Sequence, residues 1–218
     1  MKHRSDALSR KRLTRARFLE GVAVLAAADP QLGRVVARFG APALWTRKPG
    51  YAALVQIVLE QQVSLASGRT TFNRLRDACG GEVTPEAVAG LDAPALKAAG
   101  VSRQKAGYCQ DIASRILDGD LDLKTLGRAD DDAVRERLMR IRGIGPWTAN
   151  IYLMTALGRP DVWPEGDLAL AAAAQQVKKL EERPDDRRLR EMAAGWAPWR
   201  TVAARILWHH YLSERAAG

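Results

Sequence analysis

The stretch that decides the fold is Leu138-Met139-Arg140-Ile141-Arg142-Gly143-Ile144-Gly145-Pro146-Trp147-Thr148-Ala149-Asn150. One helix is expected to end here, two glycines flank an aliphatic residue, and proline stands first in the next helix, a position that it favours. Glycine permits the tight left-handed turn and a close approach of the main chain to a ligand. The N–H groups that begin the second helix form an anion site. A DNA phosphate would be gripped there without any reading of the base sequence.

Helical periodicity dominates the rest of the chain, whereas strand signals are scarce. Within residues 51–62 the apolar residues recur on one helical face, at Tyr51, Leu54, Val55, Val58 and Leu59. Further helices are expected over residues 14–27, 31–39, 147–157, 168–180 and 187–213. The sequence therefore predicts an all-α fold.

The positive charge is concentrated at the N-terminus. Residues 1–17 hold seven Lys or Arg against one acid, Asp6, and so supply +6 of the net charge of +9. A basic segment of this kind indicates a polyanionic partner such as nucleic acid. The alternative is a solvated tail that only keeps the protein soluble.

Several classes of protein are disfavoured by composition. The two cysteines, Cys79 and Cys109, stand thirty residues apart, which argues against a disulfide scaffold, a four-thiolate metal site and an iron–sulfur cluster. No apolar run approaches the roughly 20 residues that span a bilayer. The basic N-terminus is not a secretory signal, although a mitochondrial-type leader stays open. We expect a cytoplasmic protein without a membrane partner.

Three further segments, taken together with the hairpin, form a pattern that is typical of a known family. They are, in chain order, Leu59-Glu60-Gln61-Gln62-Val63-Ser64, Asp161-Val162-Trp163-Pro164-Glu165-Gly166-Asp167-Leu168-Ala169-Leu170, and Gly195-Trp196-Ala197-Pro198-Trp199-Arg200 with Ala204-Arg205-Ile206-Leu207-Trp208. With the hairpin between the first and second, this pattern resembles the helix-hairpin-helix DNA glycosylases, and within them the 3-methyladenine DNA glycosylase II family. The matches cover roughly residues 50–210.

The resemblance implies two helical lobes with the active-site cleft between them. Lobe A would comprise about residues 1–49 and 156–218, and lobe B about residues 50–155, including the hairpin at 138–151. Residues 1–17 would form a basic tail, and the whole chain one glycosylase unit that acts as a monomer. The chain is too short to carry the N-terminal β-rich domain of larger relatives.

Asp167 falls at the position of the family's catalytic aspartate. Cleavage of an N-glycosidic bond builds positive charge on the sugar, which a fixed carboxylate stabilises. An Asp that precedes Leu-Ala-Leu is also a good helix N-cap, and one residue can serve both purposes. Glu165 and Asp161 are weaker candidates. Gly166 stands where relatives often carry another acid.

The resemblance also implies a monofunctional enzyme. Bifunctional members have a lysine at the start of the second hairpin helix, and its amine forms a Schiff base with the sugar. Trp147 occupies that position, and no lysine occurs between Lys124 and Lys178. Base release without strand cleavage is therefore expected.

Two tryptophans are expected to line the base pocket. Purines alkylated on N3 or N7 are cationic and stack favourably on electron-rich rings. The resemblance places Trp147 and Trp208 at the pocket walls, with Ile151 where well-known relatives carry another aromatic residue. The ordinary fate of each tryptophan is a core position, which is the one expected for Trp163, Trp196 and Trp199.

The remaining contacts with double-stranded DNA follow from the resemblance. A base must rotate out of the duplex before cleavage, and Gln62 matches the wedge that fills the gap. Ser102, Arg103 and Lys105 resemble a second phosphate-contacting loop. The expected DNA-binding set is Gln61, Gln62, Ser64, Ser102, Arg103, Lys105, Gly143, Ile144, Gly145 and Thr148. No cofactor is expected to be required, and backbone carbonyls of Met139, Ile141 and Ile144 would hold a structural Na⁺ or K⁺ ion.

Three alternatives remain at this level. A non-catalytic helix-hairpin-helix module would need only the hairpin and the basic tail. A glycosylase for mismatched, deaminated or oxidised bases commonly carries a four-cysteine cluster or the hairpin lysine, and both are missing. A metal enzyme would have to use His3, His209 or His210, which do not form a convincing ligand set.

Overall fold

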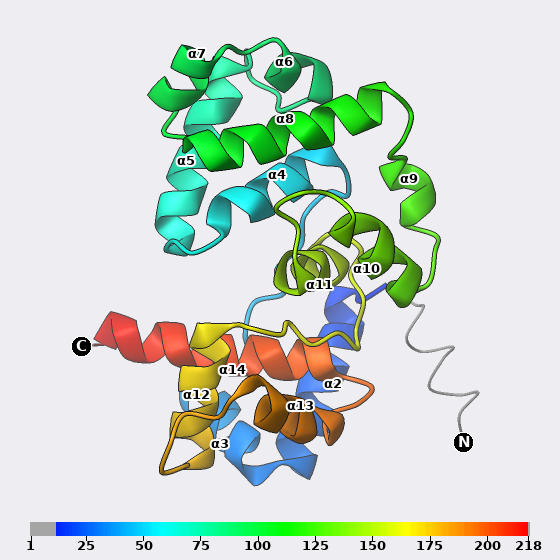
Figure 1. Cartoon of the computed structure of the whole chain (residues 1–218). Coiled ribbons are helices and arrows are strands. Elements are labelled where there is room, and N and C mark those ends of the chain that lie inside the picture. The colour runs from blue at the N-terminus through cyan, green and yellow to red at the C-terminus, as the bar shows by residue number, and fades with distance from the viewer. Residues whose placement is uncertain (1–11, 218) are drawn as a thin grey trace. The chain divides into compact units, whose positions relative to one another are not determined.

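A computed structural model describes residues 12–217, in which every regular element is a helix (Figure 1). The helices are α2 (Arg15–Ala28), α3 (Pro30–Phe39), α4 (Tyr51–Glu60), α5 (Leu65–Ala78), α6 (Pro85–Ala89), α7 (Ala93–Ala98), α8 (Arg103–Leu117), α9 (Leu123–Leu126), α10 (Asp131–Met139), α11 (Pro146–Thr155), α12 (Leu168–Lys178), α13 (Asp186–Ala194) and α14 (Arg200–Ala217). The predicted all-α class is confirmed.

The single helix expected over residues 187–213 is wrong, because the chain forms two helices there. α13 ends before its C-cap, Gly195, and α14 begins only at Arg200. Pro198 lacks the N–H that a continuous helix needs and disfavours helical backbone at the preceding residue. The apolar periodicity continues across the break, so it did not reveal the break by itself.

The chain divides into two compact units, Met1–Thr46 with Leu153–Gly218 (unit 1) and Arg47–Tyr152 (unit 2). The lobe boundaries expected from sequence fall a few residues away, after residues 49 and 155. The last part of the predicted basic tail belongs to unit 1. Leu13 is 3% exposed and its N–H donates to the Gly158 carbonyl, and α2 begins two residues later.

Unit 1 is assembled around α14, which packs on α12, α3 and α2 (Figure 1). Residues 201–208 of α14 are all buried, so this segment lies in the core rather than on the surface. Gly21 shows how closely α2 approaches, because a Cβ there would lie 2.8 Å from the Trp199 ring. Trp163, Trp196 and Trp199 are buried as well, as expected for structural residues.

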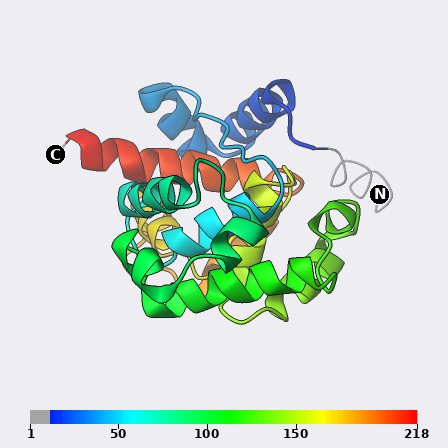
Figure 2. The ribbon, with the colours of Figure 1, turned by 90° about the horizontal axis from the view of Figure 1, so that it is seen from above.

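Unit 2 has α4 at its centre. Leu54, Val55, Ile57, Val58 and Leu59 are at most 1% exposed, because α5 and α8 both pack on this helix (Figure 2). α6 and α7 pack on α8 in turn. The α10–turn–α11 segment completes the unit and is the hairpin that the sequence predicted. None of the helices among residues 12–217 is long and apolar enough to cross a membrane.

Candidate active site and nucleic-acid interface

Asp167 is the N-cap of α12, and its side chain is held by two donors. Oδ1 accepts a hydrogen bond from the Leu170 N–H at 2.8 Å and another from Nε1 of Trp208 at 3.2 Å. The preceding residue, Gly166, has φ +76°, which places the aspartate at the end of a tight turn. The capping role is therefore present in the structure. It fixes the carboxylate in one orientation, as a catalytic carboxylate also requires.

The two weaker acidic candidates have structural partners. Asp161 forms a bidentate ion pair with Arg200, with distances of 2.7 and 2.8 Å, at the start of α14. Glu165 lies 3.5 Å from Arg190. Because Asp161 is committed to an arginine fork, Asp167 is the best placed carboxylate of this loop.

An aromatic cluster surrounds the partner of Asp167. Trp208 is 7% exposed, and its ring lies nearly parallel to that of Trp45, with centroids 5.8 Å apart and planes inclined by 21°. The guanidinium carbon of Arg205 lies 3.3 Å from the Trp45 centroid and 5.9 Å from the Trp208 centroid. Its Nε and Nη2 donate to the Ala43 carbonyl. Burial lowers the pKa of Arg205 to about 9.

Sequence reasoning did not find Trp45 and Arg205. Trp45 lies in a segment without helical periodicity, so no pattern connected it with the C-terminal helix. Arg205 did carry a signal: it is the one charged residue between Thr201 and Trp208, a stretch that the structure buries completely. A lysine or arginine in an otherwise apolar helix stretch is rarely buried without a reason.

The hairpin turn is shaped by its two glycines in different ways. Gly143 has φ +85°, and a Cβ there would lie 2.3 Å from the Tyr108 ring, so only glycine fits. A Cβ at Gly145 would meet nothing within 4 Å. Ile144 between them is 4% exposed, so its side chain anchors the turn in the core. α11 begins at Pro146 directly after this turn, and the positive end of a helix dipole favours an anion.

Gln61 ties the end of α4 to this hairpin. Its Nε2 donates to the Gly143 carbonyl at 2.9 Å and to Oγ1 of Thr148 at 2.8 Å. Lys105 contributes from α8, since its Nζ donates to the carbonyls of Leu59 and Gln61, both at 2.8 Å. Burial lowers the pKa of Lys105. The predicted DNA contacts Gln61, Lys105 and Thr148 thus come together as one internal network.

Gln62 projects from the turn that this network holds. It is exposed and has φ +56°, a left-handed conformation that is rare for residues with a Cβ. Ser64 follows as the N-cap of α5 and Ser102 as the N-cap of α8, and each side chain accepts from the main chain three residues on. A strained, exposed glutamine therefore stands between two residues with well-defined hydrogen bonds, Gln61 and Ser64.

A groove of about 1150 Å³ lies beside the hairpin, at the N-terminal end of α8. Among the described residues its wall carries three cationic side chains, those of Lys97, Arg103 and Arg142, and no carboxylate. The Arg142 guanidinium also lies 5.8 Å from the centre of the Tyr108 ring. Arg103, a predicted DNA contact, is exposed on this surface. The groove is suited to an anionic ligand.

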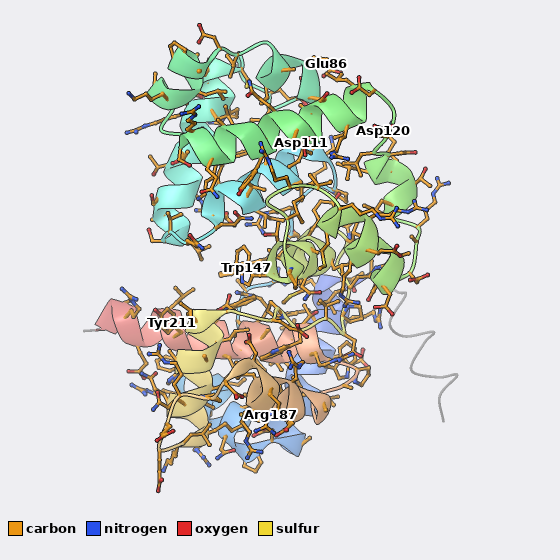
Figure 3. The ribbon with its side chains drawn as sticks, viewed as in Figure 1. Glu86, Asp111, Asp120, Trp147, Arg187 and Tyr211 are labelled. Carbon is orange, nitrogen blue, oxygen red and sulfur yellow. The ribbon has the colours of Figure 1, made fainter. Side chains whose placement is uncertain are left out.

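The first turn of α11 carries Trp147, which extends from the helix and is half-buried (Figure 3). Ile151 lies one turn later and is 5% exposed. Unit 2 thus presents an indole ring beside a buried aliphatic residue, directly after the hairpin turn. The arrangement of these two residues against Asp167 stays a prediction.

The carbonyls predicted to hold a monovalent ion lie at the end of α10 and in the hairpin turn. The Ile141 carbonyl accepts from the Ile144 N–H at 3.1 Å and keeps a second lone pair. Neutral carbonyl oxygens of Met139, Ile141 and Ile144 suit a weakly held Na⁺ or K⁺. A histidine metal site is not supported: His209 and His210 pair with Phe39 and Gln176, and residues 12–217 contain no group of three His, Cys, Asp or Glu that could hold a metal. His3 lies outside the described residues.

The fold and the hairpin define a class. Residues 55–198 match the HhH-GPD superfamily of base excision DNA repair proteins, and the chain belongs to this superfamily. The resemblance inferred from the separated motifs is thereby confirmed.

Individual relatives agree with this assignment. DNA-3-methyladenine glycosylase 1 of Schizosaccharomyces pombe is 30% identical over 165 residues, which are 74% of this chain and 72% of the relative. The structure of S. pombe 3-methyladenine DNA glycosylase Mag1 with abasic DNA has a TM-score of 0.81 at 28% identity and covers 87% of this chain and 95% of that one. The DNA-3-methyladenine glycosidase of Bacillus halodurans has a TM-score of 0.75 at 31% identity, with 90% and 91% covered. The chain covers 58% to 76% of the length of four curated relatives.

Proposed function

We propose that this protein is a monofunctional DNA glycosylase that removes alkylated bases, of the 3-methyladenine type, from double-stranded DNA in base excision repair. The observation that carries the proposal is the doubly hydrogen-bonded Asp167 carboxylate in a helix-hairpin-helix chain. Relatives named for 3-methyladenine glycosylase activity support the substrate class.

The reaction needs a fixed negative charge near the sugar. The bond between C1′ and the base nitrogen breaks, and its electron pair leaves with the base. Positive charge then develops on the sugar, and water adds to C1′ with loss of a proton. Asp167 stabilises that charge electrostatically, because two donors already hold its orientation and little reorganisation is needed.

DNA is held by its backbone. The turn at Gly143 and Gly145 presents the N-terminus of α11 to one phosphate, and the cationic groove beside it takes phosphates further along the duplex. Gln62 enters the stack where the damaged base has rotated out, since it is exposed and rigidly supported. A monovalent ion held by the carbonyls of Met139, Ile141 and Ile144 would add positive charge beside the phosphate.

Strand cleavage is not part of this proposal. A lyase of this scaffold needs an amine at the start of the second hairpin helix, and this chain has Trp147 there. The indole instead offers a face on which an electron-poor alkylated purine stacks. We propose further that the enzyme acts as a monomer in the cytoplasm and needs no iron–sulfur cluster or other cofactor for the chemistry.

The test is release of alkylated bases from methylated duplex DNA by the wild-type protein and by Asp167→Asn, with strand nicking scored before and after alkali. We expect release by the wild type, a loss of about 100-fold or more in the variant with DNA binding retained, and nicks only after alkali. Asp161→Asn is the matched control, because it removes a carboxylate of the same loop that pairs with Arg200.

Two results would contradict the proposal. Binding without release from several alkylated substrates would favour the non-catalytic DNA-binding module. Release only from duplexes that carry mismatched or deaminated bases would place the protein in the other branch of the family.

A further inference from the structure

Arg205 is a buried cation in the aromatic cluster of unit 1. It is 4% exposed, and its guanidinium lies flat enough on Trp45 to bring Cζ within 3.3 Å of the ring centroid. Nε and Nη2 both donate to the Ala43 carbonyl, at 3.2 and 2.8 Å. The same guanidinium lies 5.9 Å from the ring of Trp208, which donates to Asp167.

This charge lacks the usual compensation. Within residues 12–217 the guanidinium has no carboxylate partner, and Nη1 is buried without any hydrogen-bond partner. Arg200, on the same helix, shows the ordinary solution with its bidentate pair to Asp161. A buried charge without a counter-ion costs stability, and stacking on a desolvated indole offsets only part of that cost.

We propose that Arg205 is a positioning residue that also determines specificity: it fixes Trp208 against Asp167 and disfavours positively charged bases at this aromatic wall. The inference rests on the proposed glycosylase function. Arg205 does not touch the substrate, because its remaining donor is buried away from solvent. It acts through the stacked rings of Trp45 and Trp208.

The effect on specificity follows from charge. A purine alkylated on N3 or N7 is a cation while it is attached to the sugar, and an indole face attracts a cation through its quadrupole. Arg205 already occupies the Trp45 face and places a full positive charge close to Trp208. A second cation stacked on this wall is repelled, whereas a neutral lesion base such as hypoxanthine or ethenoadenine is not.

The experiment compares two duplexes that differ in the charge of the lesion base, 7-methylguanine and hypoxanthine, in single-turnover base release. In Arg205→Met the ratio of the 7-methylguanine rate to the hypoxanthine rate should rise about threefold to tenfold over the wild type. Arg205→Lys keeps the charge but not the planar stack, so its ratio should stay near the wild-type value while both rates fall. Arg200→Met is the control, since it removes a paired arginine from the same helix.

The outcomes separate the alternatives. A purely structural role would slow both substrates equally in Arg205→Met and leave the ratio unchanged, which would overturn the inference. If that variant does not fold, Arg205→Gln gives the same comparison, because it keeps a donor for the Ala43 carbonyl without the charge. Release of neither base by the wild type would defeat the proposed function and the inference together. Release of both by the wild type with an unaltered ratio in the variants would defeat the inference alone.

Discussion

The indole nitrogen of Trp208 donates to Oδ1 of Asp167 over 3.2 Å, and so links α14 to α12 within unit 1. The same oxygen accepts the Leu170 N–H, so donors from two helices determine where the carboxylate points. The family resemblance implied only a place for Trp208 in the wall of the base pocket. The structure adds a second role, because Trp208 holds the carboxylate that we propose stabilises the charged sugar.

This contact predicts the effect of Trp208→Phe, which keeps an aromatic ring and removes the N–H. A hydrogen bond to a charged group is worth about 1.5–3 kcal/mol, so single-turnover release should fall about 10- to 100-fold. DNA affinity should change little, because the contact lies inside unit 1. Trp163→Phe is the matched control: that ring is buried against Trp196 and should give a nearly normal rate. Equal losses in both variants would argue against the positioning role.

The two hairpin glycines predict opposite consequences of the same substitution. Gly143→Ala should destabilise the protein by several kcal/mol, because its Cβ meets the Tyr108 ring at 2.3 Å and its φ is +85°. Gly145→Ala should leave the melting temperature unchanged, since nothing lies within 4 Å of its Cβ. It should nevertheless weaken DNA binding, because the methyl group takes the space of the approaching phosphate. Thermal unfolding measures the stability of the two variants, and DNA titration measures their affinity. A normal DNA affinity in Gly145→Ala would mean that the hairpin does not contact DNA.

We expect substitution of Lys105 to impair rotation of the base out of the duplex and to leave the phosphate contacts unchanged. Its ammonium is committed to the carbonyls of Leu59 and Gln61, so Lys105→Met should loosen the turn that presents Gln62. Fluorescence of 2-aminopurine beside the lesion should show less base extrusion at saturating protein. The slope of log affinity against log salt should stay the same in Lys105→Met. In Arg103→Ala the slope should become shallower by about 0.9, which corresponds to the loss of one phosphate contact. A flattened slope in Lys105→Met would restore the phosphate-contacting role that the resemblance implied.

The structure indicates how far the basic N-terminus can be truncated without removing a buried residue. Deleting residues 1–17 would remove Leu13, which is buried and bonded to Gly158, so a lost activity could reflect damage to unit 1. Deleting residues 1–11 removes Lys2, Arg4, Arg10 and Lys11 and spares that contact. If these side chains meet DNA, the salt slope should fall by up to about 0.9 for each phosphate contact. An unchanged slope would leave the tail with a role in solubility only.

The sequence was sufficient for features that depend on local chemistry. Periodicity predicted the helical segments, although not the break before Arg200. The Gly-Ile-Gly-Pro order predicted the hairpin, and the residues after Gly166 predicted a cap at Asp167. Features that depend on which chain segments meet in space could not be predicted. Trp45 meets Trp208 across more than 160 residues, and Lys105 meets the carbonyls of Leu59 and Gln61, which lie more than 40 residues away along the chain. The lobe boundaries and the cleft expected between the lobes stay predictions.

Cys109 predicts how stability depends on pH. The thiol is 0% exposed, and burial raises its pKa to about 12 from an ordinary value of 9.0. In this interval the unfolded chain has lost the thiol proton that the native state keeps, so the free energy of unfolding should fall as pH rises from about 9 towards 12. In Cys109→Ala the free energy of unfolding should fall less steeply with pH, because the slope depends on the number of protons that unfolding releases. Lost packing in this variant lowers the free energy of unfolding at every pH and leaves the slope unchanged. Denaturant unfolding of both proteins between pH 8.5 and 10.5 measures this difference.

The control for the Cys109 prediction is Cys79→Ala. The Cys79 thiol is only half-buried, so its removal should alter the slope less. Equal slopes for the wild type and Cys109→Ala would mean that the thiol ionises in the folded protein, and therefore that water reaches the contact between α4 and α8.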